Sequence, residues 1–130
     1  MNTRFLTVSA LVAVVTSIGF AVEQPNPIKD AMDFAHKAPK GEKKLSDKIL
    51  DGTAPEADVK KTLELYKAML DTKPPKGDQA AYKEKVQKLI VATEEVVEKK
   101  PEATTHYKEA VNCKACHSEH KPQPAPAPAK

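Results

Sequence analysis

The sequence predicts an all-α fold, in which four medium or long helices form an antiparallel four-helix-bundle-like domain. Apolar residues recur at i, i+3, i+4 and i+7 in every periodic stretch after the first 25 residues or so, which is the spacing of one helix face. No stretch alternates between apolar and polar residues for long enough to form a strand. Short connections with proline or glycine separate the periodic stretches, and such connections favour antiparallel neighbours.

The first helix is expected to begin at Pro27 and to end before Pro39. Asn26 can cap its start, and proline suits the first helical position. One face of this helix carries Ile28, Ala31, Met32 and Ala35. His36 lies about 40° from Met32 around the helix axis, so we expect both side chains on the inward face.

Two further long helices are expected after a short helical segment over residues 45–50. Thr53 and Glu56 have the spacing of a capping box, which predicts a helix start at Thr53. The inward face of this helix carries Val59, Leu63, Tyr66 and Leu70, with Met69 beside them as core filler. Asp78 can cap the third long helix, which is expected to run to about Lys100. Its inward residues are Tyr82, Val86, Leu89, Ile90, Thr93, Val96 and Val97.

The last helix, expected to begin at Pro101, contains the pentapeptide C-K-A-C-H at positions 113–117. C-x-x-C-H is typical of the site where one haem c is attached, with both thiols as thioethers and the imidazole as the proximal iron ligand. On a helix, Cys113, Cys116 and His117 project from one face, where a single porphyrin can be tethered. The chain has only these two cysteines, which excludes a four-cysteine zinc site. A redox dithiol, or a disulfide in a secreted protein without haem, is the alternative.

The first 21 residues have the pattern of a signal peptide. Arg4 gives the initial segment a positive charge, an apolar run extends from Phe5 to about Ala21, and small residues precede the expected cleavage after Ala21. Without cleavage, the segment would be a membrane anchor. Either outcome places the rest of the chain in an export compartment such as the periplasm, where haem is attached to thiols.

Residues 22–121 are expected to form one monohaem helical domain, and the Pro- and Ala-rich residues 122–130 a disordered tail. The chain has 21 Lys and Arg against 18 Asp and Glu, a balance that does not indicate a nucleic-acid partner. It contains no Trp, three Phe and three Tyr, so its own side chains predict a thin core that a buried porphyrin would complete.

A single-haem chain with four predicted helices and C-x-x-C-H on the last one resembles the class II cytochromes c, the helical bundles of the cytochrome c′ and cytochrome c556 type. The resemblance covers Asn26 to Lys121 by architecture and is carried in sequence by Cys113, Cys116 and His117. Class I cytochromes place the motif near the N-terminus and take a Met ligand far downstream. Only 13 residues follow His117 and none is Met, which excludes the class I arrangement.

The resemblance implies that the distal iron ligand comes from the first helix, which covers that side of the haem in class II proteins. Met32 is the expected distal ligand, His36 is the alternative, and an iron with neither bound is the third outcome. His106 is expected about 16 Å before His117 on the same helix, too far to bind the iron. His120 is too close to His117 along that helix to reach across the ring.

The expected function is the transfer of single electrons between redox proteins through transient contacts, without enzymatic catalysis. Lys114 and Lys121 are candidates to steer such encounters. The alternative is a cytochrome c′-like protein that binds NO or CO at a five-coordinate iron. A peroxidase is disfavoured because the first helix offers no polar residue besides His36 to cleave a peroxide. Class II proteins often pair through their first two helices, so the resemblance allows a homodimer as well as a monomer.

Overall fold

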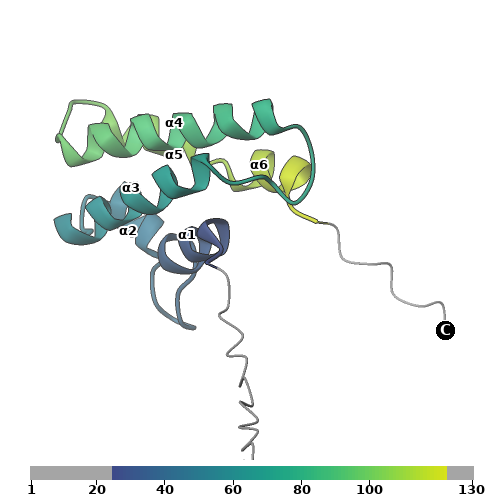
Figure 1. Ribbon diagram of the computed structural model, residues 1–130. Coiled ribbons are helices and arrows are strands. Elements are labelled where there is room, and N and C mark those ends of the chain that lie inside the picture. The colour runs from purple at the N-terminus through teal and green to yellow at the C-terminus, as the bar shows by residue number, and fades with distance from the viewer. Residues whose placement is uncertain (1–24, 123–130) are drawn as a thin grey trace, which may run out of the picture.

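The computed structural model describes residues 25–122 of the chain (Figure 1). This part is mostly helical and contains no strand, which confirms the predicted all-α class. The predicted signal peptide, residues 1–21, and residues 123–130 of the predicted tail lie outside the described residues. Between residues 25 and 122, no helix is long and apolar enough to cross a membrane.

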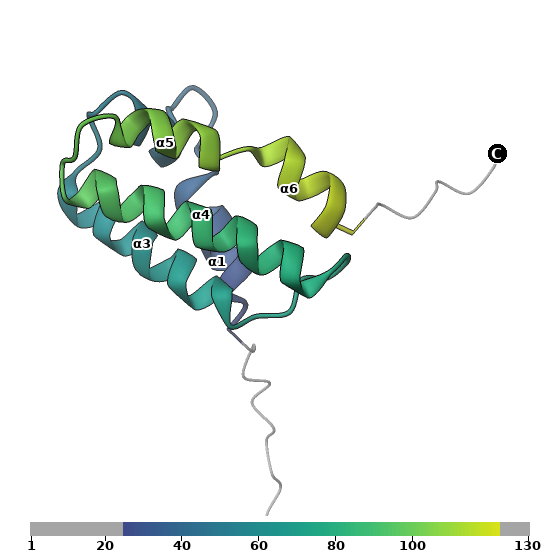
Figure 2. The same ribbon diagram turned by 90° about the horizontal axis from the view of Figure 1, so that it is seen from above.

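Six helices make up the described part of the chain. Their bounds are α1 (Pro27–Ala35), α2 (Leu45–Leu50), α3 (Glu56–Leu70), α4 (Gln79–Val97), α5 (Ala103–Ala110) and α6 (Cys113–His120). α1 packs on α3, α3 on α4 and α4 on α5, while the short α2 lies against α1 and α5. The chain reverses between α3 and α4, and α6 extends beyond α5 in a new direction to lie against α4 (Figure 2).

Two of the helix starts form as the sequence predicts. Asn26 caps α1, because its side chain accepts a hydrogen bond from the Lys29 backbone N–H (3.1 Å), and Pro27 takes the first helical position. Asp78 caps α4 by accepting from the Ala81 N–H (2.8 Å). Each cap satisfies a backbone donor that has no partner within the first turn.

The predicted capping box at the start of α3 is wrong. α3 begins at Glu56, directly after Pro55, and no side chain caps it. The Thr53 hydroxyl instead donates to the Lys48 carbonyl oxygen in α2 (3.4 Å). The reason is Pro55, whose ring disfavours the helical conformation at Ala54 and so delays the helix.

The predicted continuous last helix is also wrong, because the chain leaves the helical path between α5 and α6. α5 ends at Ala110, Val111 has a ψ of 52°, and α6 begins at Cys113. The Asn112 side chain accepts from the Ala115 N–H (3.0 Å) and caps α6. Asn favours such a position, because its short polar side chain competes with helical hydrogen bonds. The C-x-x-C-H motif therefore occupies the first turns of a new helix.

Three tyrosines fill the centre of the core. Tyr66, Tyr82 and Tyr107 come from α3, α4 and α5, and each is at most 2% exposed. Aliphatic side chains pack around them: Ile49, Val59, Val86, Leu89 and Ile90. The sequence pattern predicts that Leu63 is buried, but Leu63 is only partly buried and its neighbour Thr62 is fully buried instead. The Thr62 hydroxyl tolerates burial because it donates to the backbone carbonyl one turn earlier (2.8 Å).

Candidate cofactor-binding site

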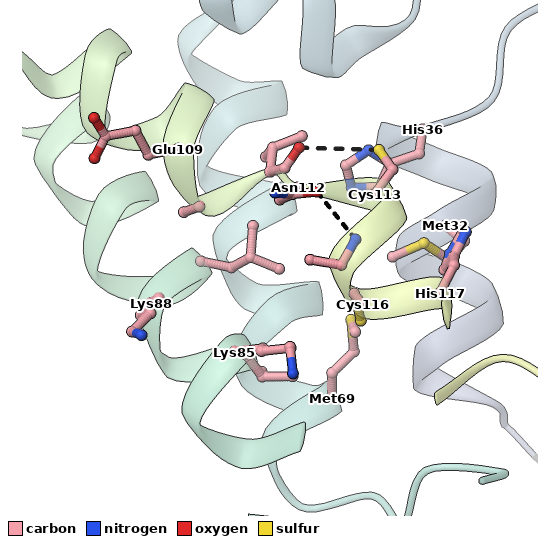
Figure 3. A pocket seen from close by; sticks show the side chains of 15 residues that line it. Met32, His36, Met69, Lys85, Lys88, Glu109, Asn112, Cys113, Cys116 and His117 are labelled. Atoms are coloured by element: carbon pink, nitrogen blue, oxygen red, sulfur yellow. Dashed lines mark hydrogen bonds between the residues drawn. The ribbon is translucent and has the colours of Figure 1, made fainter. Parts of the chain in front are cut away.

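A cavity of about 260 Å³ lies beside α1, α4 and α6 (Figure 3). The start of α6 lines it with Cys113, Cys116 and His117, and Met32 on α1 and His36 directly after α1 line it from the other helix. Aliphatic groups of α4, of α5 and of the segment after α5 line another part: Val86, Leu89, Ala110 and Val111. All five residues that the sequence selects as candidate haem-binding residues thus face one cavity.

Both cysteines carry free thiols, and the two thiols differ in their surroundings. Cys113 is exposed at the first position of α6, with its sulfur 4.0 Å from the Val111 carbonyl oxygen. Cys116 is half-buried, and burial raises the pKa of its thiol, although the positive charge of Lys85 acts in the opposite direction. Both sulfurs and the exposed His117 imidazole reach the cavity from one end of one helix.

His36 directly follows α1, and its side chain is held by a hydrogen-bonded chain of two buried tyrosine hydroxyls. Its Nε2 atom lies 2.7 Å from the Tyr66 hydroxyl oxygen, which lies 3.2 Å from the Tyr107 hydroxyl oxygen. The His36 and Tyr66 rings also stack, with centroids 6.0 Å apart. Because Nε2 is engaged whichever partner carries the proton, Nδ1 is the His36 nitrogen that is left for a group in the cavity.

Burial decides the protonation states along this chain of side chains. It lowers the pKa of His36 to about 4, and the charge of His117 acts in the same direction. Burial also raises the pKa of Tyr107 to about 12 and that of Tyr66 well above its ordinary value. At neutral pH the chain therefore consists of a neutral imidazole and two protonated phenols.

The two methionines at the cavity come from different helices. Met32 is partly buried on α1, one turn before His36. Met69 is buried on α3, as expected of core filler, and it also lines the cavity. A thioether sulfur is only a weak hydrogen-bond acceptor, so neither side chain needs a polar partner in this place.

The two other histidines do not line this cavity. His106 lies on α5 rather than on the helix of His117, and its Nδ1 lies 2.6 Å from a carboxylate oxygen of Glu95. This carboxylate raises the pKa of His106. His120 is 4% exposed at the end of α6. Among the residues that the structure describes, no three His, Cys, Asp or Glu are arranged to hold a metal ion.

Sequence reasoning missed three residues that shape the site. Tyr66 is predicted on an inward helix face, but its hydrogen bonds to His36 and to Tyr107 join residues 30 and 41 positions apart. No local pattern reports such contacts. Asn112 did carry a signal, because Asn directly before a helical stretch is a preferred cap.

The residues around the cavity fit a haem. They comprise two thiols and an imidazole on α6, a thioether and a second imidazole on α1, and an aliphatic wall between. Thiols, thioethers and imidazoles are the protein groups that hold c-type haems. The cavity is smaller than the roughly 300–1,000 Å³ of pockets that enclose a whole ligand. The cavity is therefore not large enough to enclose a whole porphyrin.

Comparisons with protein-family models, with curated proteins and with solved structures find no match to this chain.

Proposed function

We propose that this protein is an exported monohaem c-type cytochrome that carries single electrons between redox proteins. One observation carries the proposal: the three residues of the attachment motif and both candidate distal ligands line a single cavity (Figure 3). These residues lie on α6 and on α1 or directly after it, and these two helices are distant in sequence. The tertiary structure thus brings together side chains that the motif and the family resemblance select separately.

On the α6 side, Cys113 and Cys116 would hold the haem by two thioether bonds, and His117 would be its proximal ligand. The bound haem would supply the one-electron chemistry. α6 supports these roles because Asn112 caps it and orders its first turn. Within the all-α class, we propose that α1, α3 and α4 form a four-helix bundle with a fourth helix that is interrupted between α5 and α6.

On the α1 side, the hydrogen bond between the Tyr66 hydroxyl and His36 Nε2 favours Met32 as the distal ligand. His36 could bind a metal through Nδ1, or through Nε2 only if this bond broke, whereas the Met32 sulfur is not restricted by any strong hydrogen bond. A thioether is a soft, neutral ligand that raises the reduction potential of the iron. We therefore propose a carrier of relatively high potential, with His36 as a polar neighbour.

A five-coordinate protein that binds NO or CO is the second candidate. The same Tyr66–His36 hydrogen bond favours it, because it restricts one of the two residues that can occupy the distal position to a single ring nitrogen. If Met32 stays unbound, the iron has an open position facing α1. Neither candidate involves an enzymatic reaction. In both cases the predicted export signal and transient redox partners are further parts of the proposal.

The attachment test uses the full chain expressed with a bacterial haem-attachment system. The wild type should keep haem stain through denaturing electrophoresis, and the Cys113→Ala/Cys116→Ala double variant should lose it. Lys114→Ala is the matched control, because Lys114 lies within the motif and is exposed. Stain that survives in the double variant, or a wild type without covalent haem, would refute the proposal.

The distal ligand is tested by absorption spectroscopy of the ferric protein. A Met32–iron bond should give a weak far-red charge-transfer band that is lost in Met32→Ala and kept in His36→Ala. Met69→Leu is the control, because Met69 also lines the cavity and leucine nearly conserves its volume. Loss of the low-spin spectrum in His36→Ala alone would indicate two histidine ligands. A high-spin wild type unchanged by either substitution would indicate the gas-binding protein.

A further inference from the structure

α6 is attached to the rest of the molecule mainly through its last residue. Of its eight residues, His120 is the one that is buried, at 4% exposure. The helix packs against α4, and its first turns face the cavity rather than the core. The position of the whole helix therefore depends strongly on how His120 is held.

The His120 ring is held by the segment that joins α3 to α4. Its Nδ1 lies 3.1 Å from the Lys76 carbonyl oxygen, 44 positions earlier in the chain. A carbonyl oxygen can only accept, so Nδ1 carries the proton and donates this bond. The ring also packs edge-on against Tyr82, with centroids 5.5 Å apart. One side chain thus joins the end of α6 to the connecting segment and to the core.

Gly77 shows how closely the two backbones meet at this point. It has a φ of +84°, and a Cβ atom there would lie 2.7 Å from the Glu119 carbonyl oxygen and 2.9 Å from His120 Nδ1. No real Cβ contact is that short, so only glycine lets the end of α6 approach. The Glu119 carboxylate also pairs with the Lys85 ammonium group of α4 (2.6 Å).

We propose that His120 is a positioning residue that anchors α6 and thereby holds the C-x-x-C-H motif against the cavity. His120 lies three residues after His117, about 4.5 Å along the same helix axis, so a shift of one moves the other. The role toward haem rests on the proposed function, whereas the anchoring of α6 does not. Loss of the anchor should free α6 while the packing of α3 on α4 persists.

The first experiment measures amide hydrogen exchange by NMR in the full chain, with and without attached haem. His120→Ala should speed exchange of the α6 amides at least about tenfold and leave those of α3 and α4 unchanged. His120→Asn should restore protection, because the Asn amide nitrogen can take the place of Nδ1. His120→Gln should not, because its amide reaches the position of Nε2, which has no hydrogen-bond partner among residues 25–122. Unchanged α6 exchange in His120→Ala would overturn the proposal.

A second pair of variants approaches the contact from the other side. Gly77→Ala and Gly41→Ala both add a methyl group at a positive φ, but a Cβ at Gly41 meets nothing within 4 Å. Gly77→Ala should therefore reproduce the faster α6 exchange, and Gly41→Ala should not. Equal effects of the two substitutions would mean that backbone strain, not the contact with α6, is responsible, and would count against the anchor.

The haem-loaded protein tests whether the anchor matters at the site. His120→Ala should lower the yield of attached haem and shift the reduction potential, and His120→Asn should restore both. Faster α6 exchange with an unchanged yield, spectrum and potential would make His120 a structural residue and overturn its positioning role. If the wild type acquires no haem, the proposed function fails, and the exchange data still decide whether His120 anchors α6.

Discussion

The α3–α4 hairpin and α6 are held in the molecule in opposite ways. α3 and α4 bury side chains along most of their length: Val59, Thr62, Tyr66 and Met69 on α3, and Tyr82, Val86, Leu89, Ile90, Ala92 and Thr93 on α4. α6 buries His120 alone and directs its cysteines toward a cavity. Stability and candidate chemistry thus lie in separate elements. Elements with few buried contacts open at a lower free energy than the core, which is common for ligand-binding segments.

The largest effect should come from the hairpin. Ile90 is 4% exposed, so Ile90→Ala should lower the free energy of unfolding by about 2–5 kcal/mol through lost burial and a new cavity. Val91→Ala is the matched control, because Val91 is 46% exposed on the same helix and should cost less than about 0.5 kcal/mol. Urea denaturation followed by circular dichroism measures both. Similar losses at the two positions would show that the hairpin is not the stable core.

A smaller loss is expected where the hairpin meets α1. Tyr66→Phe removes the hydroxyl between His36 and Tyr107 and should cost about 1–3 kcal/mol, because buried polar partners are left unsatisfied. The Tyr66→Phe/Tyr107→Phe double variant should cost less than the sum of the single variants, since the hydroxyls act as one network. Chemical denaturation of the four proteins tests this coupling. Additive losses would contradict the hydrogen-bonded chain.

Removing one helix cap from the α3–α4 hairpin and one from α6 compares the two regions by the same kind of substitution. Asp78→Ala removes the cap of α4 and should lower the global free energy of unfolding by about 0.5–2 kcal/mol. Asn112→Ala removes the cap of α6 and should instead speed amide exchange in α6, with little change in global stability. Denaturation and hydrogen exchange on both variants separate the two results. A global loss in Asn112→Ala as large as that in Asp78→Ala would mean that α6 unfolds together with the core.

The smallest effect is expected on the surface between α4 and α5. The Glu95 carboxylate raises the pKa of His106, so the folded state holds this proton more tightly than the unfolded state. The resulting stabilisation is complete below the ordinary pKa of about 6.5 and is lost as the pH rises through the raised value. An NMR titration should show a lower His106 pKa in Glu95→Gln than in the wild type. The same His106 pKa in both proteins would contradict the pairing.

The sequence predicted the helical class, the two helix caps at Asn26 and Asp78, and most of the buried residues of α4, because these features depend on residues within a few turns. On α3 it predicted the burial of Val59 and Tyr66 but not that of Thr62. The predicted capping box at Thr53 was wrong because Pro55 delays the start of α3. The predicted continuous last helix was wrong because Asn112 ends the helical path and caps a new helix. Both errors arose where one local signal opposed another. The composition is enough to suggest a thin core, but not that all three tyrosines would fill its centre.

The sequence by itself determined the candidate chemistry, since Cys113, Cys116 and His117 form one short motif and Met32 and His36 share one turn of a helix. The tertiary structure alone decided that both groups line one cavity, that Tyr66 engages His36, and that His120 is buried against the segment joining α3 and α4. The physical reason is the separation in sequence over which each kind of interaction acts. Helix periodicity and caps act over one or two turns, whereas these contacts join residues at least 30 positions apart and exist only once the helices have packed.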